Sequence, residues 1–346
     1  MQYFLGVDYH KAFSYCTMMD ERGKIVKQGK MENSSDGVED FVKDVDGKIT
    51  GVMEATRNWT LMYDWLEEEI DAVKLAHPLK VKAIAEAKVK TDKIDSNTLA
   101  HLLRCDLLPE SYVPSKEARY IRQVLRQRIF FVRIQTMLKN RIRGIIDKHP
   151  EVGTPPVENL FGVEGLAWIK RVTLPDIDKK IIESDVELLT SVKERISRSD
   201  KLIEELGKGD ERVEHLISIP GIGKFFAVLL CHEIDDINRF RDDKKLHAYA
   251  GLVPSTYASG NRVMHGHITK QGNKWIRWAM VEAVWPAIRK DQELRSFYER
   301  LKIKKGANCA KVATAKRLLT IVYRVLKEKR FYKVHGCPDI ILAVSK

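Results

Sequence analysis

The stretch "QYFLGVDYHKAFSYCTMMDERGKIVKQGKM", residues 2–31, holds three short apolar segments. The first covers residues 2–8 and ends on an aspartate, and the segments 13–20 and 23–31 meet at the turn "ERGK". Short apolar runs separated by glycine and charged turn residues are typical of strands. The chain is therefore predicted to open with three strands in succession.

Helical and extended patterns alternate after this opening. Residues 34–45 begin with Ser and Asp and continue with helical periodicity, while 48–56 have the pattern of a short buried strand that ends at Glu54. Residues 58–70 then form an amphipathic helical pattern, and 72–85 a strand that runs into a helix. Three leading strands followed by this alternation predict a mixed α/β sheet covered by helices.

The segment 115–148 is predicted to be one long basic helix. It contains ten Lys or Arg residues and two acidic residues. Its apolar residues recur close to the helical period and form one stripe, at Ile121, Val124, Leu125, Phe131, Ile134, Leu138, Ile142 and Ile145. We expect this stripe to be buried or to form a dimer contact, and the basic face to remain free for a polyanion.

The remainder of the chain changes character twice. Residues 149–165, with three prolines and three glycines, are predicted to be a linker or hinge. The more acidic segment 176–208 has the regular apolar spacing of an antiparallel helix pair or coiled coil. After about residue 210 the pattern is that of a compact, α-rich domain.

Composition narrows the class of protein. The 346 residues are 44% hydrophobic and 31% charged, which excludes wholesale disorder, and the formal net charge of +12 favours a polyanionic partner such as nucleic acid. A basic ribosomal or membrane-surface protein would share that charge. No apolar run reaches the roughly 18 residues of a spanning helix, and no signal peptide is expected. Five scattered cysteines without metal-ligand spacing fit a reduced, cytoplasmic setting.

Four carboxylates are placed where a sheet would bring them together. Asp8 ends the first predicted strand and Glu54 ends a later one, while Asp92 and Asp95 in "KTDKIDS" are three residues apart and share one helix face. Converging carboxylates repel one another and need a counter-ion, and oxygen ligands select Mg²⁺ or Mn²⁺. The alternative is that each is a cap or an exposed charge.

A glycine-containing turn divides two apolar helical segments in "LISIPGIGKFFAVLLCHEI", residues 216–234. Gly221 and Gly223 permit a tight turn, and the amides at the start of the second helix could face a phosphate. This arrangement is similar to the helix-hairpin-helix motif, which grips the nucleic-acid backbone without reading sequence. A plain helical hairpin is the alternative.

The segment 246–285 combines a Ser-Gly turn with several cations and an amide. Ser259 is followed by Gly260, and Arg262, Lys270, Asn273, Lys274 and Arg277 come after them. A serine hydroxyl becomes a nucleophile when a base takes its proton or when cations stabilise the developing charge. The alternatives are a structural turn, or Ser255 as the nucleophile.

Five motifs, taken in this order, resemble those of the DEDD-type insertion-sequence transposases and the related Piv-type DNA invertases. They are "GVDYHK" (6–11), "VMEAT" (52–56), "KTDKIDS" (90–96), "IPGIG" (219–223) and "AGLVPSTYASGNRVMHGHITKQGNKWIR" (250–277). The resemblance extends to about residue 332, and it is the combination of motifs that is specific.

The resemblance implies a three-part chain. It implies a RuvC-like, RNase H-like α/β domain at residues 1–110, a helical, coiled-coil-like region that includes the basic helix at 111–210, and an α-rich transposase domain with the helix-hairpin-helix motif at 211–346. In this family Asp8, Glu54, Asp92 and Asp95 would bind Mg²⁺ or Mn²⁺. Ser259 would attack the scissile phosphate and form a 5′-phosphoserine link.

The implied function is a DNA transposase or site-specific recombinase that cleaves and rejoins DNA strands. Several members are guided by a structured noncoding bridge RNA and assemble as tetramers. The expected partners are therefore donor and target DNA and a bridge RNA, and the chain is expected to form a dimer or tetramer. The expected location is the bacterial or archaeal cytoplasm, in association with the nucleoid. The alternatives are a Holliday-junction-type nuclease using only the carboxylates, and a non-catalytic nucleic-acid-binding scaffold. The residues predicted to contact nucleic acid are Lys11, Arg122, Arg126, Arg133, Lys139, Arg141, Arg143, Gly221, Gly223, Lys224, Arg262, Lys270, Asn273, Lys274 and Arg277.

Overall fold

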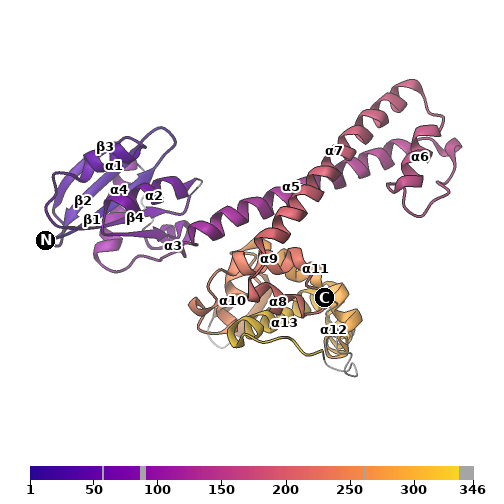
Figure 1. Cartoon of the computed structure of the whole chain (residues 1–346). Coiled ribbons are helices and arrows are strands. Elements are labelled where there is room, and N and C mark those ends of the chain that lie inside the picture. The colour runs from indigo at the N-terminus through magenta and orange to yellow at the C-terminus, as the bar shows by residue number, and fades with distance from the viewer. Residues whose placement is uncertain (57, 86–90, 260–261, 335–346) are drawn as a thin grey trace. The chain divides into compact units, whose positions relative to one another are not determined.

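The computed structural model divides into two compact units, Met1–Val113 and Pro114–Lys346 (Figure 1). It describes the chain except residues 57, 86–90, 260–261 and 335–346, and it gives the backbone without the side chains at 257–259, 262–263 and 265. The division of the chain at residues 110 and 210 stays a prediction.

A five-stranded sheet with the order β3-β2-β1-β4-β5 forms the centre of the first unit. The strands β1 and β2 pair antiparallel, as do β2 and β3, whereas β4 and β5 run parallel to β1. The predicted mixed α/β sheet is therefore confirmed. The strands are β1 (Gln2–Tyr9), β2 (Ser14–Asp20), β3 (Ile25–Met31), β4 (Lys48–Glu54) and β5 (Ala72–Ala76).

Helices cover both faces of this sheet. Leu5 and Val7 of β1 pack into a core with the helices α1 (Ser35–Val42) and α2 (Trp59–Glu69). Phe4 packs with Val52 against the opposite side, which is covered by α3 (Pro78–Ile84) and α4 (Asp92–Arg104). Because successive strand residues point to opposite faces, the even-numbered residues of β1 and β4 face α3 and α4.

The helix α4 approaches β1 unusually closely, and Gly6 permits it. A Cβ atom on Gly6 would lie 2.0 Å from the Ser96 carbonyl oxygen and 2.7 Å from the Ala100 nitrogen, both in the backbone of α4. The buried hydroxyls of Ser96 and Thr17 share a hydrogen bond of 2.7 Å that joins α4 to β2. These contacts fix both the height and the rotation of α4 over the sheet.

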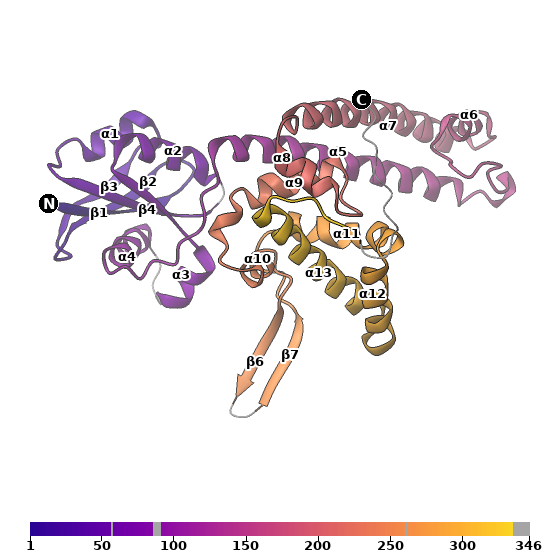
Figure 2. The ribbon, with the colours of Figure 1, turned by 60° about the horizontal axis from the view of Figure 1, so that its bottom comes forward.

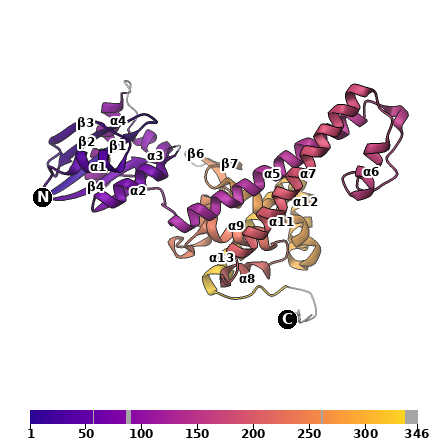
Figure 3. The same cartoon turned by 45° about the horizontal axis from the view of Figure 1, so that its top comes forward.

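Two long helices form an antiparallel hairpin in the second unit: α5 (Lys116–Ile146) and α7 (Asp176–Leu206), which lie side by side (Figure 3). Their far ends pack around Leu138, Ile142 and Leu189. The ion pairs Arg128–Asp200 (2.8 Å) and Arg141–Asp185 (3.2 Å) connect the two helices along their length.

The segment predicted as a linker is the connection at the tip of this hairpin. It contains a short 3₁₀ turn, η1 (Pro150–Val152), and the first residues of the helix α6 (Val163–Arg171), and its Phe161 is buried in the hairpin core. His149 binds Asp178 (2.8 Å) and Glu151 (3.0 Å) through its two ring nitrogens, which raises the pKa of its imidazole.

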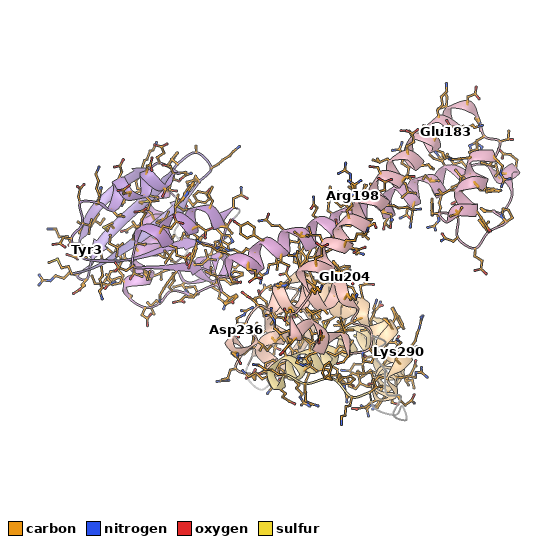
Figure 4. The ribbon with its side chains drawn as sticks, viewed as in Figure 1. Tyr3, Glu183, Arg198, Glu204, Asp236 and Lys290 are labelled. Carbon is orange, nitrogen blue, oxygen red and sulfur yellow. The ribbon has the colours of Figure 1, made fainter. Side chains whose placement is uncertain are left out.

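The near ends of the hairpin join a larger, α-rich core, as predicted. Ile121, Leu125 and Ile203 contribute to it from α5 and α7. Glu204, labelled in Figure 4, lies on α7 at this junction. It forms an ion pair with Lys224 of α9. The other elements are α8 (Glu211–Ile217), α9 (Lys224–Ile234), η2 (Ile237–Arg239), α10 (Asp243–Tyr249), α11 (Lys274–Lys290), α12 (Gln292–Lys305) and α13 (Ala307–Glu328).

A two-stranded hairpin, β6 (Pro254–Ser259) and β7 (Arg262–Ile268), was not anticipated from the sequence. Its antiparallel pairs run from Pro254–Ile268 to Ser259–Arg262. Figure 2 shows it extending away from the helices of its own unit.

Candidate functional site

The parallel pairing of β1 and β4 brings Asp8 and Glu54 to the same edge of the sheet. Val7 pairs with Met53, so Asp8 and Glu54 are the next residues on neighbouring strands, at the carboxyl end of each. Both are even-numbered residues of their strands, so their side chains lie on the face of the sheet that α3 and α4 cover.

The first turn of α4 adds the two aspartates to the same place. The Thr91 hydroxyl caps this helix by accepting from the Ile94 amide, and Asp92 and Asp95 follow in the first turn. The electrostatic influence of both aspartates reaches the Asp8 carboxyl. The predicted shared helix face is thus found, whereas Lys90 of the same motif lies outside the described residues.

His10 is a member of this cluster that sequence reasoning missed. Its Nε2 atom lies 3.1 Å from Asp8 Oδ2 and 3.3 Å from Asp92 Oδ1. The three donor atoms all lie within 4.8 Å of one another. The available signal was the i,i+2 spacing from Asp8, which places side chains on one face of an extended segment.

A cavity of about 950 Å³ opens beside the cluster. Asp8, Glu54 and Asp95 line it together with Lys11, which was predicted to contact nucleic acid. The wall also includes residues that sequence reasoning did not select: Tyr9, His10, Thr56, Asn58, Lys82 and Thr98.

The electrostatics of the cluster favour a bound cation. Burial is the main cause that raises the pKa of the Asp8 carboxyl; His10 opposes this shift, and Asp95 and Asp92 add to it. Neighbouring carboxylates repel one another when they are charged, and a bound positive ion offsets that repulsion. The donor set, carboxylate oxygens with one imidazole nitrogen, fits a divalent cation.

Ser259 belongs to the second unit, whereas the four carboxylates belong to the first. It is the last residue of β6, and its backbone pairs with that of Arg262. Gly260 lies outside the described residues, as do the side chains of Ser259 and Arg262. The competing serine, Ser255, donates its hydroxyl hydrogen to the His267 carbonyl across the hairpin (3.1 Å).

Part of the predicted basic surface gathers around Trp275 at the start of α11. The guanidinium carbons of Arg126 and Arg133 lie 5.7 and 5.5 Å from the centroid of its ring, and Lys274 Nζ lies 4.9 Å from it. Cations within about 6 Å of an indole face are attracted by its π electrons. This cationic aromatic patch joins residues far apart in the sequence.

Three predicted nucleic-acid contacts are instead engaged inside the domain. The buried Arg122 donates to the carbonyls of His232 (2.8 Å) and Glu233 (3.0 Å) at the end of α9. Asn273 caps α11 through its Oδ1 and donates to the fully buried Glu233 carboxylate through its Nδ2 (2.8 Å). Arg277 donates to the Ala250 carbonyl (2.7 Å), and burial lowers the pKa of its guanidinium. These bonds give each side chain a structural role, as does the ion pair of Arg126 with the same Glu233 carboxylate (2.8 Å), and contact of these residues with nucleic acid stays a prediction.

Other predicted cations lie on the hairpin of α5 and α7. Lys139 and Arg143 lie 5.6 and 5.0 Å from the Phe161 ring centroid, and Lys193 donates to the Phe161 carbonyl (2.7 Å). Burial, with the positive charges of Lys193 and Arg143, lowers the pKa of Lys139. Lys270, in the loop before α11, is exposed and has a positive φ of 54°.

The two glycines between α8 and α9 have different roles. Gly221 has a φ of +90°, and a Cβ atom there would lie 2.4 Å from the Ala283 carbonyl oxygen of α11. Gly223 is the N-cap residue of α9, and the space beside it is open. Gly221 is therefore required by packing, and only Gly223 stands free at the helix start.

Within the described part of the chain, no helix combines the length and the apolar character needed to cross a bilayer.

Comparison with known proteins connects this geometry to a family. Residues 5–149 match a model for DEDD transposases of the IS110 type, and residues 213–299 match the model described as "Transposase IS116/IS110/IS902 family". A "Probable family 20 transposase" of Pseudomonas aeruginosa is 24% identical over 338 residues, which are 95% of this chain and 98% of the relative. The "Transposase for insertion sequence element IS1111A" of Coxiella burnetii is also 24% identical, over 95% of this chain and 91% of its own length.

A further relative has a different printed role. The "Pilin gene-inverting protein" of Moraxella bovis is 26% identical over 286 residues, covering 81% of this chain and 80% of that protein. Transposition and site-specific inversion both cut and rejoin DNA. The two family models lie in chain order over about two thirds of the sequence, and the relatives align over most of their length. The chain therefore belongs to the IS110 family of DEDD transposases, and it is a DNA transposase or recombinase.

Proposed function

We propose that this transposase cleaves and rejoins DNA with a divalent metal, Mg²⁺ or Mn²⁺, held by Asp8, Glu54, Asp92 and Asp95, and with Ser259 as the nucleophile. The observation that carries the metal centre is the convergence of two strand ends and the first turn of α4 beside one cavity. The strand order β3-β2-β1-β4-β5 supports an RNase H-like fold for the first unit.

The side chains divide the work. A bound divalent cation supplies electrostatic stabilisation to the charged phosphate and lowers the pKa of an attacking hydroxyl. The carboxylates would hold that cation, while Lys11 in the cavity wall would offset phosphate charge. The Ser259 hydroxyl loses its proton as its oxygen bonds to phosphorus; the bond to the 3′ oxygen breaks, and that oxygen takes up a proton and leaves as a 3′ hydroxyl, so that a 5′-phosphoserine link remains.

The nucleic-acid interface that we propose consists of the predicted contacts other than Gly221, Arg122, Asn273 and Arg277, which already have packing or hydrogen-bonding roles. It comprises Lys11, Arg126, Arg133, Lys139, Arg141, Arg143, Gly223, Lys224, Arg262, Lys270 and Lys274. Gly221 supports the turn between α8 and α9, which we take to be a helix-hairpin-helix element. A backbone-directed surface of this kind suits a structured guide RNA as well as duplex DNA.

We further propose that the guide is a structured noncoding RNA encoded beside the gene and that the chain assembles as a dimer or tetramer. Two large apolar side chains on the outer side of α5 support the assembly: Phe130 is 58% exposed and Met137 is 70% exposed. RNA that copurifies with the protein would be identified by sequencing, and mass photometry would give the number of subunits. A monomer without a copurifying structured RNA would overturn both parts.

The decisive test of the nucleophile is a covalent-adduct assay. The full chain, the neighbouring noncoding RNA and both DNA sites are incubated with Mg²⁺, and protein–DNA adducts are resolved in denaturing gels. Ser259→Ala should abolish the adduct, and the matched variant Ser255→Ala should retain it. An adduct that survives Ser259→Ala and disappears in Ser255→Ala would assign the reaction to the other serine.

The metal centre has a separate test. Asp92→Asn should remove strand cleavage and metal binding, whereas Asp44→Asn, an exposed carboxylate paired with Lys27 at 3.7 Å, should change neither. Full recombination by Asp8→Asn would contradict a catalytic role for this carboxylate.

A hydrolytic nuclease of the Holliday-junction type is the second candidate, because the four carboxylates belong to one unit and Ser259 to the other. Cleavage that persists in Ser259→Ala without any adduct would establish it.

A further inference from the structure

We infer that His10 is a ligand of the metal, so that the centre is a mixed nitrogen–oxygen site and not a carboxylate-only site. This inference rests on the proposed metal centre and adds a residue that determines which metals it prefers. The starting observation is that Nε2 of His10 faces two of the proposed ligands at once, Asp8 Oδ2 at 3.1 Å and Asp92 Oδ1 at 3.3 Å.

These separations suit a shared cation. Ligand bonds of about 2.1 Å place neighbouring donor atoms about 3.0 Å apart at right angles and about 3.4 Å apart in a tetrahedron. Both observed separations, 3.1 and 3.3 Å, fall between these two values. The His10 nitrogen and either carboxylate oxygen are therefore spaced to share one ion, and the three donor atoms all lie within 4.8 Å of one another.

If His10 acted only as a hydrogen-bond donor, it could not give each of the two carboxylates a hydrogen of its own. One imidazole nitrogen carries a single hydrogen, so the two carboxylates would share it. As a ligand, the nitrogen presents its lone pair to the ion, and each carboxylate presents its own oxygen. The repulsion among the carboxylates is then relieved by the ion.

The backbone of His10 is held in place at both of its polar groups. Its amide donates to the Phe13 carbonyl (3.2 Å), and its carbonyl accepts from Asn33 Nδ2 (2.7 Å). Asn33 is itself fixed because its Oδ1 accepts from the Ser14 hydroxyl (2.7 Å). Side chains that hold a ligand in position are typical of metal sites, where they set the ligand's orientation.

A nitrogen ligand has a consequence for metal choice. Imidazole suits Mn²⁺ less than Co²⁺ or Zn²⁺ but far better than Mg²⁺, which strongly prefers oxygen. Replacing His10 should therefore weaken the binding of transition metals and leave the binding of Mg²⁺ nearly unchanged. His10→Gln is the suitable variant, because the glutamine amide reaches a similar position and offers an oxygen.

The test is pulsed electron paramagnetic resonance on the full-length protein loaded with Mn²⁺, with calorimetric titrations of Mn²⁺ and Mg²⁺ alongside. The wild type should show modulation from a directly bound ¹⁴N nucleus that changes when histidine is labelled with ¹⁵N. His10→Gln should lose that modulation and bind Mn²⁺ at least about tenfold more weakly. The control His101→Gln, a histidine of α4 outside the cavity wall, should match the wild type.

The outcomes separate this inference from the proposed function. Mn²⁺ bound without nitrogen modulation, or modulation that persists in His10→Gln, would overturn the role of His10 and leave the carboxylate centre standing. Failure of the wild type to bind either metal would overturn the centre itself. Hydrogen exchange of β1 and α4 confirms that each variant is folded.

Discussion

Replacing Gly6 by alanine should separate the two halves of the candidate metal centre. The new Cβ atom would lie 2.0 Å from the Ser96 carbonyl oxygen, where ordinary contacts begin at 3.4 Å, so α4 must withdraw by about 1.4 Å. The obstructing atoms belong to a helix backbone and cannot rotate aside. Overpacking of this kind costs about 1–3 kcal/mol of folding stability. Moving α4 would also weaken the Thr17–Ser96 hydrogen bond, at a further cost of about 1 kcal/mol. We expect the first unit to lose roughly 2–4 kcal/mol.

The same displacement should weaken metal binding. Asp92 and Asp95 move with α4, whereas Asp8 stays on β1, and metal–ligand distances tolerate about 0.2 Å. Hydrogen exchange followed by mass spectrometry reports the stability of β1 and α4 separately from the second unit, and calorimetry reports Mn²⁺ binding. Gly29→Ala, in β3, is the control, because the space beside Gly29 is open. If Gly6→Ala shows the protection and metal affinity of Gly29→Ala, the close approach of α4 does not hold the centre together.

Three further predictions concern the second unit. Arg122→Ala should cost about 1–3 kcal/mol in urea unfolding, because the carbonyls of His232 and Glu233 lose their buried donor while Arg126 still pairs with the Glu233 carboxylate. Gly221→Ala should cost about 2–4 kcal/mol and Gly223→Ala less than about 1 kcal/mol in the same assay, and equal losses would contradict the packing role. The pKa of His149 is raised in the folded protein, so its contribution to the stability of the hairpin tip is fully present below its unfolded pKa and is lost as pH rises through its folded pKa. Hydrogen exchange at the tip should therefore accelerate over that pH range by more than the intrinsic effect of pH. The variant His149→Gln should show no such step.

Local patterns predicted most of the elements because they are properties of short segments. The three opening strands, the sheet continuing through Lys48–Glu54, and the long basic helix all begin and end within a few residues of their predicted bounds. Asp8 and Glu54 could be expected together because each ends a buried strand, and parallel strands share an edge. The hairpin of β6 and β7 escaped prediction because its residues alternate weakly between polar and apolar.

Contacts made across the chain were beyond the reach of local patterns. Arg122 and Arg126 are one helical turn apart on the same helix, yet the structure buries the first beneath α9 and leaves the second 42% exposed beside Trp275. Nothing in their neighbouring residues distinguishes them. His10 was missed for the same reason, since its partner Asp92 lies more than eighty residues further along the chain.

The pairing of α5 with α7 lets the arm that they form vary in length without disturbing what lies at either end. Its apolar contacts recur with a near-heptad spacing, as in Ile182, Val186 and Leu189, and each end has a core of its own. Seven residues added to both helices would move the tip outward by about 10 Å and turn it by only about 20°. Seven residues added to one helix would instead put its apolar side chains out of step with those of its neighbour. A relative with a longer or shorter arm should therefore carry compensating insertions or deletions in the two helices, and the arm could serve as an adjustable spacer.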